Sequence, residues 1–205
     1  MILCDIGNTS YHFLDGDAEY KRDVKSFIPS AYQDKVYYIS VNSEVNKKLH
    51  GLKNWIDISS YVDKSQYYES MGIDRIFSCE AIESGVVVDG GSAITVDIVK
   101  NGNFMGGFIY PGVNAMRETY KKISPALDYS FNFDLELDIM PKNSQDAISY
   151  GFLKTLFTEV SSYDMPIILT GGDASLLQKV FKTAIVENEL IFKGMKKIIK
   201  KAKLC

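Results

Sequence analysis

Positive charge and long apolar runs are both scarce in this chain. Its 23 lysines and arginines are outnumbered by 26 acidic residues, so the net charge is −3 and no basic field is available to attract nucleic acid. No apolar run is long enough to span a membrane. The first residues lack the basic start of a signal peptide, and Asp5 interrupts their apolar run. We therefore expect a cytoplasmic protein that binds neither nucleic acid nor a membrane.

Cysteine, histidine and arginine are rare as well. The three cysteines, Cys4, Cys79 and Cys205, are odd in number and far apart, which fits neither a disulfide framework nor a metal-ligand motif. A zinc site or a Ser-His triad would have to be built from only two histidines, His12 and His50. Because there are only three arginines, an arginine inside a motif is more informative than a lysine would be.

What the sequence does contain is a repeated construction of strand, aspartate and glycine turn. Residues 2–10 read ILCDIGNTS, and residues 86–99 read VVVDGGSAITVDIV. In both copies an apolar strand ends at an aspartate, Asp5 or Asp89, and the two aspartates are 84 positions apart. We interpret this repetition as a degenerate internal duplication.

Hydrophobic patterning predicts a similar α/β plan in both halves, so we expect two domains, residues 1–84 and 85–205. Each half would contain an antiparallel meander of three strands followed by α/β crossovers. A long amphipathic helix is expected over residues 144–163 and a loop over residues 61–71. Near the C-terminus the pattern favours a strand at residues 189–192 and then a lysine-rich helix.

The two glycine turns have the features of a phosphate-binding site. Glycine turns expose backbone N–H groups, and Thr9, Ser10 and Ser92 add hydroxyls that bind phosphate oxygens. The carboxylates of Asp5 and Asp89 would repel a phosphate, so a cation is expected between them. The alternative is a pair of ordinary β-turns whose polar side chains cap the backbone. Because two related copies occur in one short chain, we favour phosphate binding.

A second informative stretch is the sequence GIDR at residues 72–75. Asp74 could accept a hydroxyl proton during phosphoryl transfer, and Arg75 could bind a carboxylate with two parallel hydrogen bonds. The alternative is a helix-capping aspartate beside a surface arginine, which the spacing alone favours slightly. Two further glycine motifs, at residues 106–112 and 170–173, occur at strands where a ligand or another backbone can approach closely, although a barrel bend explains the glycines at 106–112 equally well.

Five of these motifs, in this order, resemble those of the type III pantothenate kinases. They are DIGNT at residues 5–9, GIDR at 72–75, DGGSA at 89–93, GGFIYPG at 106–112 and TGGD at 170–173. The resemblance covers most of the chain. It implies an α/β fold of two RNase H-like domains, each with a mixed five-stranded sheet, as in actin, hexokinase and Hsp70. It also implies ATP-dependent phosphorylation of pantothenate to 4′-phosphopantothenate, the first step of coenzyme A synthesis, by a homodimer that uses Mg²⁺ and a monovalent cation, K⁺ or NH₄⁺.

Carried over residue by residue, the resemblance implies a role for each motif. Asp74 would be the proton acceptor, Asp89 would bind the monovalent cation, and Asp5 would hold the divalent cation indirectly. The residues that would contact pantothenate are Tyr68, Gly72, Ile73, Asp74, Arg75 and Ser144, with Tyr67 as the alternative to Tyr68. The residues that would contact ATP are Asp5, Ile6, Gly7, Asn8, Thr9, Ser10, Tyr11, His12 and Ser92. Serine stands at positions 92 and 144 where the family usually has threonine, which keeps the hydroxyl and loses a methyl group.

Two other functions are compatible with parts of the sequence. An actin-like regulatory protein would bind ATP without pantothenate-dependent turnover, but the motif at residues 72–75 argues against it. An RNase H-like nuclease built from Asp5, Asp89 and Asp97 would need carboxylates clustered around two metal ions. The acidic net charge and the lack of a basic groove make the nuclease the weaker alternative.

Overall fold

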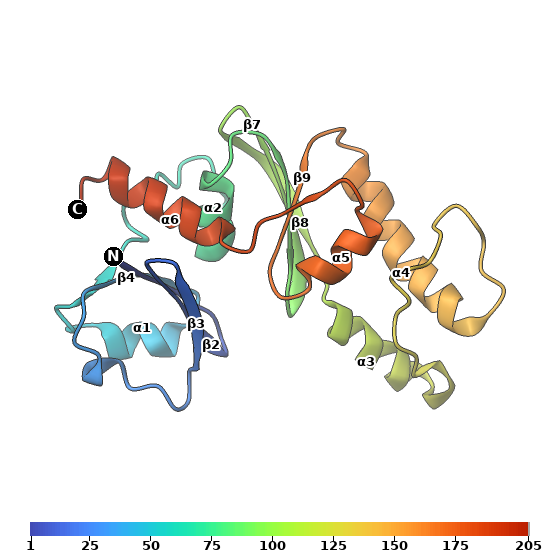
Figure 1. Cartoon of the computed structure of the whole chain (residues 1–205), viewed down its shortest axis with the longest axis horizontal. Coiled ribbons are helices and arrows are strands. Elements are labelled where there is room, and N and C mark those ends of the chain that lie inside the picture. The colour runs from blue at the N-terminus through green and yellow to red at the C-terminus, as the bar shows by residue number, and fades with distance from the viewer. Residues whose placement is uncertain (205) are drawn as a thin grey trace. The chain divides into compact units, whose positions relative to one another are not determined.

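The computed structural model describes residues 1–204 and divides into two compact units (Figure 1). The first unit contains Met1–Ile82 together with residues 190–204, and the second contains Glu83–Glu189. The division after Ile82 lies close to the domain boundary expected at residue 85. The C-terminal segment, however, groups with the first unit instead of the second.

The first unit is built on a mixed five-stranded sheet with the strand order β3-β2-β1-β4-β5. Its strands are β1 (Ile2–Ile6), β2 (Ser10–Asp15), β3 (Ala18–Asp23), β4 (Val36–Ser40) and β5 (Trp55–Asp57). The first three form an antiparallel meander, and β4 and β5 add in parallel beside β1. A short 3₁₀ turn, η1 (Pro29–Ala31), precedes β4.

One face of this sheet carries an aromatic-rich core. Cys4 and Ile6 are two residues apart on β1 and therefore point to the same face, where they pack with Tyr11 and Trp55. Helix α1 (Ser43–Leu49) forms the crossover between β4 and β5, and its buried residues join the same cluster. The parallel pairing of β4 with β5 requires such a crossover.

The other helices of the first unit are α2 (Ile73–Glu80) and α6 (Leu190–Lys201), which pack against each other. Figure 1 shows them on the side of the sheet opposite α1. Their close approach depends on Gly194, because a Cβ atom at this position would collide with the carbonyl group of Phe77. The first unit is therefore a three-layer arrangement of helix, sheet and helix pair.

The C-terminal segment corrects one prediction. The strand expected at residues 189–192 is not formed, since this stretch enters α6, and the last strand, β10 (Ile185–Val186), lies a few residues earlier. A short apolar run fits a buried strand and the start of a helix equally well by pattern alone. The helix prevails because Phe192, Met195 and Ile199 recur at helical spacing and are buried within the first unit.

The second unit repeats the plan of the first. Its sheet, read from one edge, has the order β8-β7-β6-β9-β10, which is equivalent to β3-β2-β1-β4-β5. The strands that precede β10 are β6 (Gly85–Gly90), β7 (Ala93–Lys100), β8 (Asn103–Pro111) and β9 (Ile167–Thr170). The first three again form an antiparallel meander, and β9 and β10 again add in parallel. Both units thus repeat one plan, as the internal duplication predicts, and have the topology of an RNase H-like domain, as the family resemblance implies.

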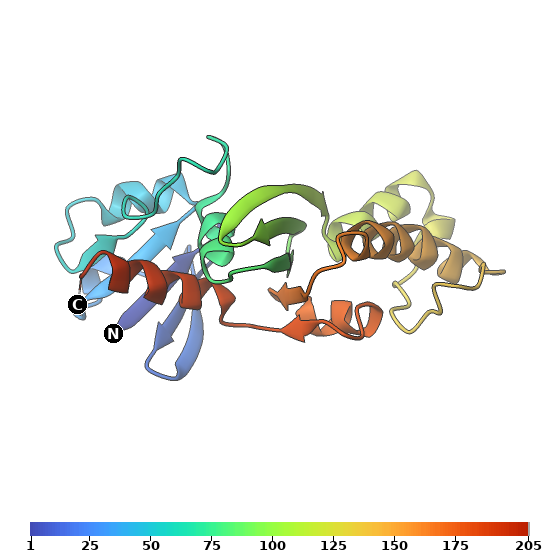
Figure 2. The same ribbon diagram turned by 90° about the horizontal axis from the view of Figure 1, so that it is seen from above.

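Helices α3, α4 and α5 complete the second unit, and Figure 2 shows α3 and α4 together at one end of its sheet. Their bounds, with that of the 3₁₀ turn η2, are α3 (Val113–Ile123), η2 (Pro125–Leu127), α4 (Ser144–Ser161) and α5 (Ala174–Val180). Phe152 and Leu156 of α4 share one core with Val96 and Leu169 of the sheet. Among residues 1–204, none of the helices combines the length and the hydropathy that crossing a membrane requires.

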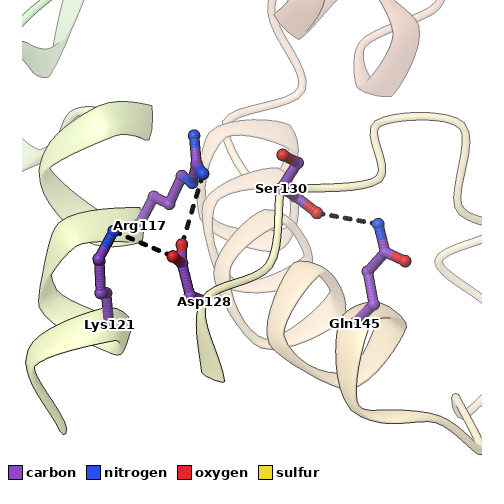
Figure 3. A network of polar contacts seen from close by, with 5 residues as sticks. All are labelled: Arg117, Lys121, Asp128, Ser130 and Gln145. Carbon is purple, nitrogen blue, oxygen red and sulfur yellow. Dashed lines mark hydrogen bonds and ion pairs between the residues drawn. The ribbon is translucent and has the colours of Figure 1, made fainter. Parts of the chain in front are cut away.

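A polar network connects α3, η2 and α4 (Figure 3). The carboxylate of Asp128, just after η2, forms ion pairs with Lys121 Nζ at 3.0 Å and Arg117 Nη2 at 3.4 Å, both on α3. Two residues further, the carbonyl oxygen of Ser130 accepts a hydrogen bond from Nε2 of Gln145 in α4 at 3.1 Å. The connection between the two helices is thus held by side chains from both of them.

Candidate active site

The first glycine turn joins β1 to β2 at the end of a buried strand. The backbone N–H of Gly7 donates to the carbonyl oxygen of Ser10, 3.0 Å away, and Asn8 and Thr9 are exposed at the tip of the turn. Asp5 occupies β1 just before the turn. Backbone N–H groups and hydroxyls suited to a phosphate therefore lie in the same segment as a carboxylate, which would need a cation between itself and a phosphate.

His12 on β2 is the direct cross-strand neighbour of Asp5 on β1. Its Nε2 atom is 2.6 Å from Oε1 of Glu19 on β3. The edge of its ring contacts Phe192 of α6, with 4.8 Å between the ring centroids. His12 is thus oriented by a carboxylate on one side and an aromatic ring on the other.

Two residues of the first turn motif have side chains that no ligand can reach. Ile6 and Tyr11 are 0% and 1% exposed and belong to the aromatic-rich core. Burial also raises the pKa of the Tyr11 hydroxyl to about 12. The prediction that both residues contact ATP therefore concerns their backbone groups, and it stays a prediction.

The second glycine turn, after β6, is held by two other glycine motifs of the second unit. The backbone N–H of Asp173 donates to the carbonyl oxygen of Gly90 at 2.9 Å. Gly171 has a positive φ of 83°, and a Cβ atom there would collide with the carboxylate of Asp89. A Cβ atom at Gly112 would likewise collide with the carbonyl oxygen of Ser92. The motifs at residues 89–93, 106–112 and 170–173 therefore meet at one place in the fold.

The oxygen atoms at this meeting point suit a hard cation. The space beside Gly171 accommodates the Asp89 carboxylate next to the Gly90 carbonyl oxygen, and K⁺ and Mg²⁺ prefer such oxygen ligands. Within residues 1–204 no group of three or more histidine, cysteine, aspartate or glutamate side chains could hold a metal ion by itself. A cation bound here would need further ligands from phosphate groups and water.

The GIDR motif opens helix α2 in the first unit. Gly72 is the N-cap residue and Asp74 lies in the first helical turn, where its Oδ1 atom accepts a hydrogen bond from the backbone N–H of Arg75 at 2.8 Å. A Cβ atom at Gly72 would collide with this same Oδ1 atom. The carboxylate is thus stabilised at a helix N-terminus, in a position that only a glycine at residue 72 permits.

Arg75 is not the surface arginine of the alternative interpretation, because it is only 7% exposed. Its Nη1 atom donates to the hydroxyl oxygen of Tyr68 at 2.6 Å, and its guanidinium group lies 5.8 Å from the centre of the Tyr68 ring. The neighbouring Tyr67 instead donates its hydroxyl to Oε1 of Glu80 at 3.0 Å. Tyr68 is therefore the tyrosine beside the GIDR motif, although its contact with a substrate stays a prediction.

Ser144 begins helix α4 in the second unit, as expected, but it does not cap that helix. The cap is Asn143, whose Oδ1 atom accepts a hydrogen bond from the backbone N–H of Asp146 at 2.9 Å. Asp146 in turn receives side-chain hydrogen bonds from Asn132 and Asn143, which lower the pKa of its carboxyl group. This polar cluster next to Ser144 was not predicted from the sequence, although the N-x-x-D spacing at 143–146 is a helix-start signal.

Comparison with known proteins identifies the family. A family model described as type III pantothenate kinase matches residues 18–163. A Type III pantothenate kinase from Sulfurimonas denitrificans is 64% identical over 205 residues, which cover 100% of both chains. The chain belongs to the type III pantothenate kinase family. A further Type III pantothenate kinase, from Campylobacter jejuni, is 41% identical over 98% of this chain and 97% of the relative.

Solved structures agree with the fold of this pantothenate kinase family member. A crystal structure from Campylobacter jejuni, which bears the name of a conserved Baf family transcriptional activator, matches with a TM-score of 0.91 and 40% identity over 100% of both chains. A structure from Sinorhizobium meliloti named as a 2-dehydro-3-deoxygalactonokinase matches with a TM-score of 0.58 and 10% identity, over 98% of this chain and 96% of that one. The expected α/β fold of the actin-like ATPases and sugar kinases is confirmed.

Family membership also decides between the functional alternatives. It favours a kinase over an actin-like nucleotide-binding protein without kinase activity, and over a nuclease. The family model begins at residue 18, so the turn at residues 5–12 lies outside the matched segment, whereas the relatives cover this turn as well. The roles of individual site residues stay predictions.

Proposed function

We propose that this protein transfers the γ-phosphoryl group of ATP to the primary hydroxyl of pantothenate and forms 4′-phosphopantothenate, the first step of coenzyme A synthesis. The observation that carries the proposal is the pairing of Asp74 with a buried Arg75 at the start of α2, in a member of this kinase family. A carboxylate and a buried guanidinium on consecutive residues at the start of one helix match a substrate that has both a hydroxyl group and a carboxylate.

Arg75 and Asp74 would divide the recognition and the chemistry between them. The guanidinium of Arg75 would bind the pantothenate carboxylate, and Tyr68, which already contacts it, would help to orient it. Asp74 would accept the proton of the attacking hydroxyl. Gly72 and Ile73 would contribute backbone contacts, and Ser144 a hydroxyl contact to pantothenate.

The two glycine turns would hold ATP. Backbone N–H groups of residues 5–12, with the hydroxyls of Thr9 and Ser10, would bind phosphate oxygens, and Ser92 would add a hydroxyl from the second turn. Asp89 would bind a monovalent cation, K⁺ or NH₄⁺, and Asp5 would hold Mg²⁺ indirectly. When bound, these cations neutralise negative charge on the phosphates.

The proposal extends to assembly and location. We expect a homodimer, as the family resemblance implies, and a cytoplasmic enzyme, because its substrates are the small molecules of a biosynthetic step. Light scattering of the purified protein would measure the oligomeric state directly.

A coupled assay with ATP, pantothenate, Mg²⁺ and K⁺ tests the proposed reaction. Asp74→Asn should lower kcat by about 10²- to 10⁴-fold, since the amide cannot accept the proton. The matched control is Asp164→Asn, because Asp164 is exposed and has a φ of 49°, which asparagine also adopts readily. Normal turnover of Asp74→Asn would refute its role as proton acceptor. ATP binding by the unaltered protein without turnover would refute the proposed function as a whole.

A further inference from the structure

The loop between β5 and α2 carries two adjacent tyrosines that reach opposite ends of the same helix. Tyr68 contacts Arg75 near the start of α2, and Tyr67 donates its hydroxyl to Glu80, the last residue of α2. We infer that Tyr67 is a positioning residue for the substrate site, because its bond to Glu80 holds the loop that places Tyr68 against Arg75. This inference rests on the proposed function, in which Arg75 and Tyr68 bind pantothenate.

Regular secondary structure does not fix the path of this loop. Residues 61–71 contain neither a helix nor a strand, and most of their side chains are exposed. Val62 and Met71, near the two ends, are the residues of this stretch with side chains in the core. Between them, single backbone hydrogen bonds connect Tyr67 to Lys64 and Met71 to Tyr68, both at 3.0 Å. These bonds shape the loop locally, whereas the two tyrosine hydroxyls connect it to α2.

The acceptor of the Tyr67 bond stands on a rigid support. Glu80 ends α2, and its backbone carbonyl oxygen accepts a hydrogen bond from Lys197 Nζ of α6 at 2.8 Å. The α2–α6 contact is close because Gly194 has no side chain. A hydrogen bond from a phenol to a carboxylate is also stronger than one between two neutral groups. Tyr67 is therefore tied to the packed part of the first unit and not to another loop.

A loop held in place before the substrate arrives lowers the entropy that binding must overcome. If the Tyr67 bond is removed, Tyr68 and Arg75 stay chemically intact, but the loop samples more conformations in the free enzyme. The loss should therefore appear in the apparent affinity for pantothenate and not in the chemical step. ATP binding, assigned to other segments, should be unaffected.

Steady-state kinetics of Tyr67→Phe separate these effects. We expect the KM for pantothenate to rise about 3- to 10-fold, somewhat less than a complete hydrogen bond to a charged group would give. The values of kcat and of the KM for ATP should stay within about twofold, as for a change that removes only uniform binding. The matched control is Tyr61→Phe, an exposed tyrosine of the same loop, which should leave all three constants unchanged. An unchanged KM for pantothenate in Tyr67→Phe would overturn the inference, and so would an equal loss in kcat.

The acceptor provides an independent variant. Glu80→Ala should raise the KM for pantothenate as Tyr67→Phe does, whereas Glu80→Gln keeps an acceptor oxygen and should retain most of the affinity. The double variant Tyr67→Phe/Glu80→Ala should be no worse than either single variant, because both remove the same bond. Additive effects of the two substitutions would contradict the coupling.

Hydrogen exchange of the whole protein tests the loop without relying on activity. Amides of residues 61–71 should exchange faster in Tyr67→Phe than in the unaltered protein, while those of β1 and β6 should not change. If the unaltered protein failed to phosphorylate pantothenate, the proposed function would be wrong, yet this measurement would still decide whether the Tyr67 bond holds the loop. Unchanged exchange in the loop would overturn the inference.

Discussion

Single glycines make room for the acidic groups of the candidate site. Gly72 leaves space for the carboxylate of Asp74, and Gly171 does the same for Asp89. The two cases differ in backbone conformation. Gly171 has φ 83°, which strains any other residue, whereas Gly72 has φ −58°, which every residue adopts. Position 72 therefore allows a purely steric test.

Replacing Gly72 by alanine should displace the Asp74 carboxylate without unfolding the helix. We expect kcat to fall about 10- to 100-fold, because a proton acceptor that shifts by around 1 Å loses its alignment with the reacting hydroxyl. Circular dichroism should show the fold retained, and steady-state kinetics with saturating substrates measures the effect.

Gly151→Ala is the control for this substitution. Gly151 lies inside α4, and a Cβ atom there would meet no heavy atom within 4 Å. This variant should keep full activity and gain roughly 0.5–1 kcal/mol in free energy of unfolding, because alanine is the better helix residue. A normal kcat in Gly72→Ala would contradict the steric role of Gly72.

For single residues, the sequence predicted which residue types form the candidate site better than it predicted whether their side chains are buried or exposed. The residue types of the GIDR motif suggested a base beside a carboxylate-binding arginine, but the spacing alone slightly favoured a surface position for Arg75, which is in fact buried. Tyr11, taken as part of a phosphate turn, has its ring in the core. Burial depends on what packs from distant parts of the chain, which no local motif records.

Among the elements, the segment from α3 to α4 is stabilised by polar contacts as well as by its apolar core. A hydrogen bond from Lys121 lowers the pKa of Asp128 below its ordinary value of 3.8, and the charges of Lys121 and Arg117 add to the effect. Figure 3 shows both cations directed at the same carboxylate. The contribution of this network to stability should therefore depend on the ionisation of Asp128.

Asp128→Asn should lower the free energy of unfolding near neutral pH. Because the carboxyl pKa is lower in the folded protein than in the unfolded chain, the stabilisation is complete above the ordinary pKa of 3.8 and disappears as the pH falls through the lower folded value. The difference between variant and unaltered protein should thus stay constant from neutral pH to about pH 5 and shrink below about pH 4. Urea unfolding at several pH values measures it.

The control for this series is Asp138→Asn, because the Asp138 side chain is 99% exposed and its Oδ1 atom lies 3.7 Å from Nζ of Lys154. Its difference from the unaltered protein should be small at every pH. A pH-independent difference for Asp128→Asn would exclude the ion pairs as its cause.

Helices and strands with a strong local sequence pattern were predicted well, whereas those with a weak local pattern were not. The helix expected at residues 144–163 is observed as α4 (Ser144–Ser161), because a long amphipathic pattern marks it. The strand expected at residues 189–192 is wrong, because the three apolar residues that follow Glu189 do not distinguish a strand from the first turn of α6. Packing against α2 decides the outcome there.

For the whole molecule, the position of the C-terminal helix α6 is the feature that the order of elements along the sequence does not predict. The apolar face of α6 is buried in the first unit, although α6 follows the second unit in the sequence. The first unit is therefore assembled from both ends of the chain, and it should depend on its last helix.

A chain that ends at Glu189 should lose structure in the first unit and keep it in the second. Removal of α6 exposes the face of α2 and part of the sheet that it covers, so amides of β1 and β2 should lose protection from hydrogen exchange. Amides of β6 and β7, of which Val86, Val88, Ile94 and Val96 lie in a core that contains no residue of α6, should stay protected and serve as the internal control. Loss of protection mainly in β6 and β7 would contradict the division into units.

The sequence by itself determined the duplication, the strand order within each meander and the chemistry available at each turn. These features depend on the local pattern of apolar and polar residues and on residue type, both of which can be identified from the sequence alone. Only the tertiary structure decided that the three glycine motifs of the second unit meet around Asp89, and that Arg75 is buried beside Tyr68. It likewise decided that α6 completes the first unit. Each of these outcomes depends on contacts between residues far apart in sequence, where close packing, and not local preference, selects the arrangement.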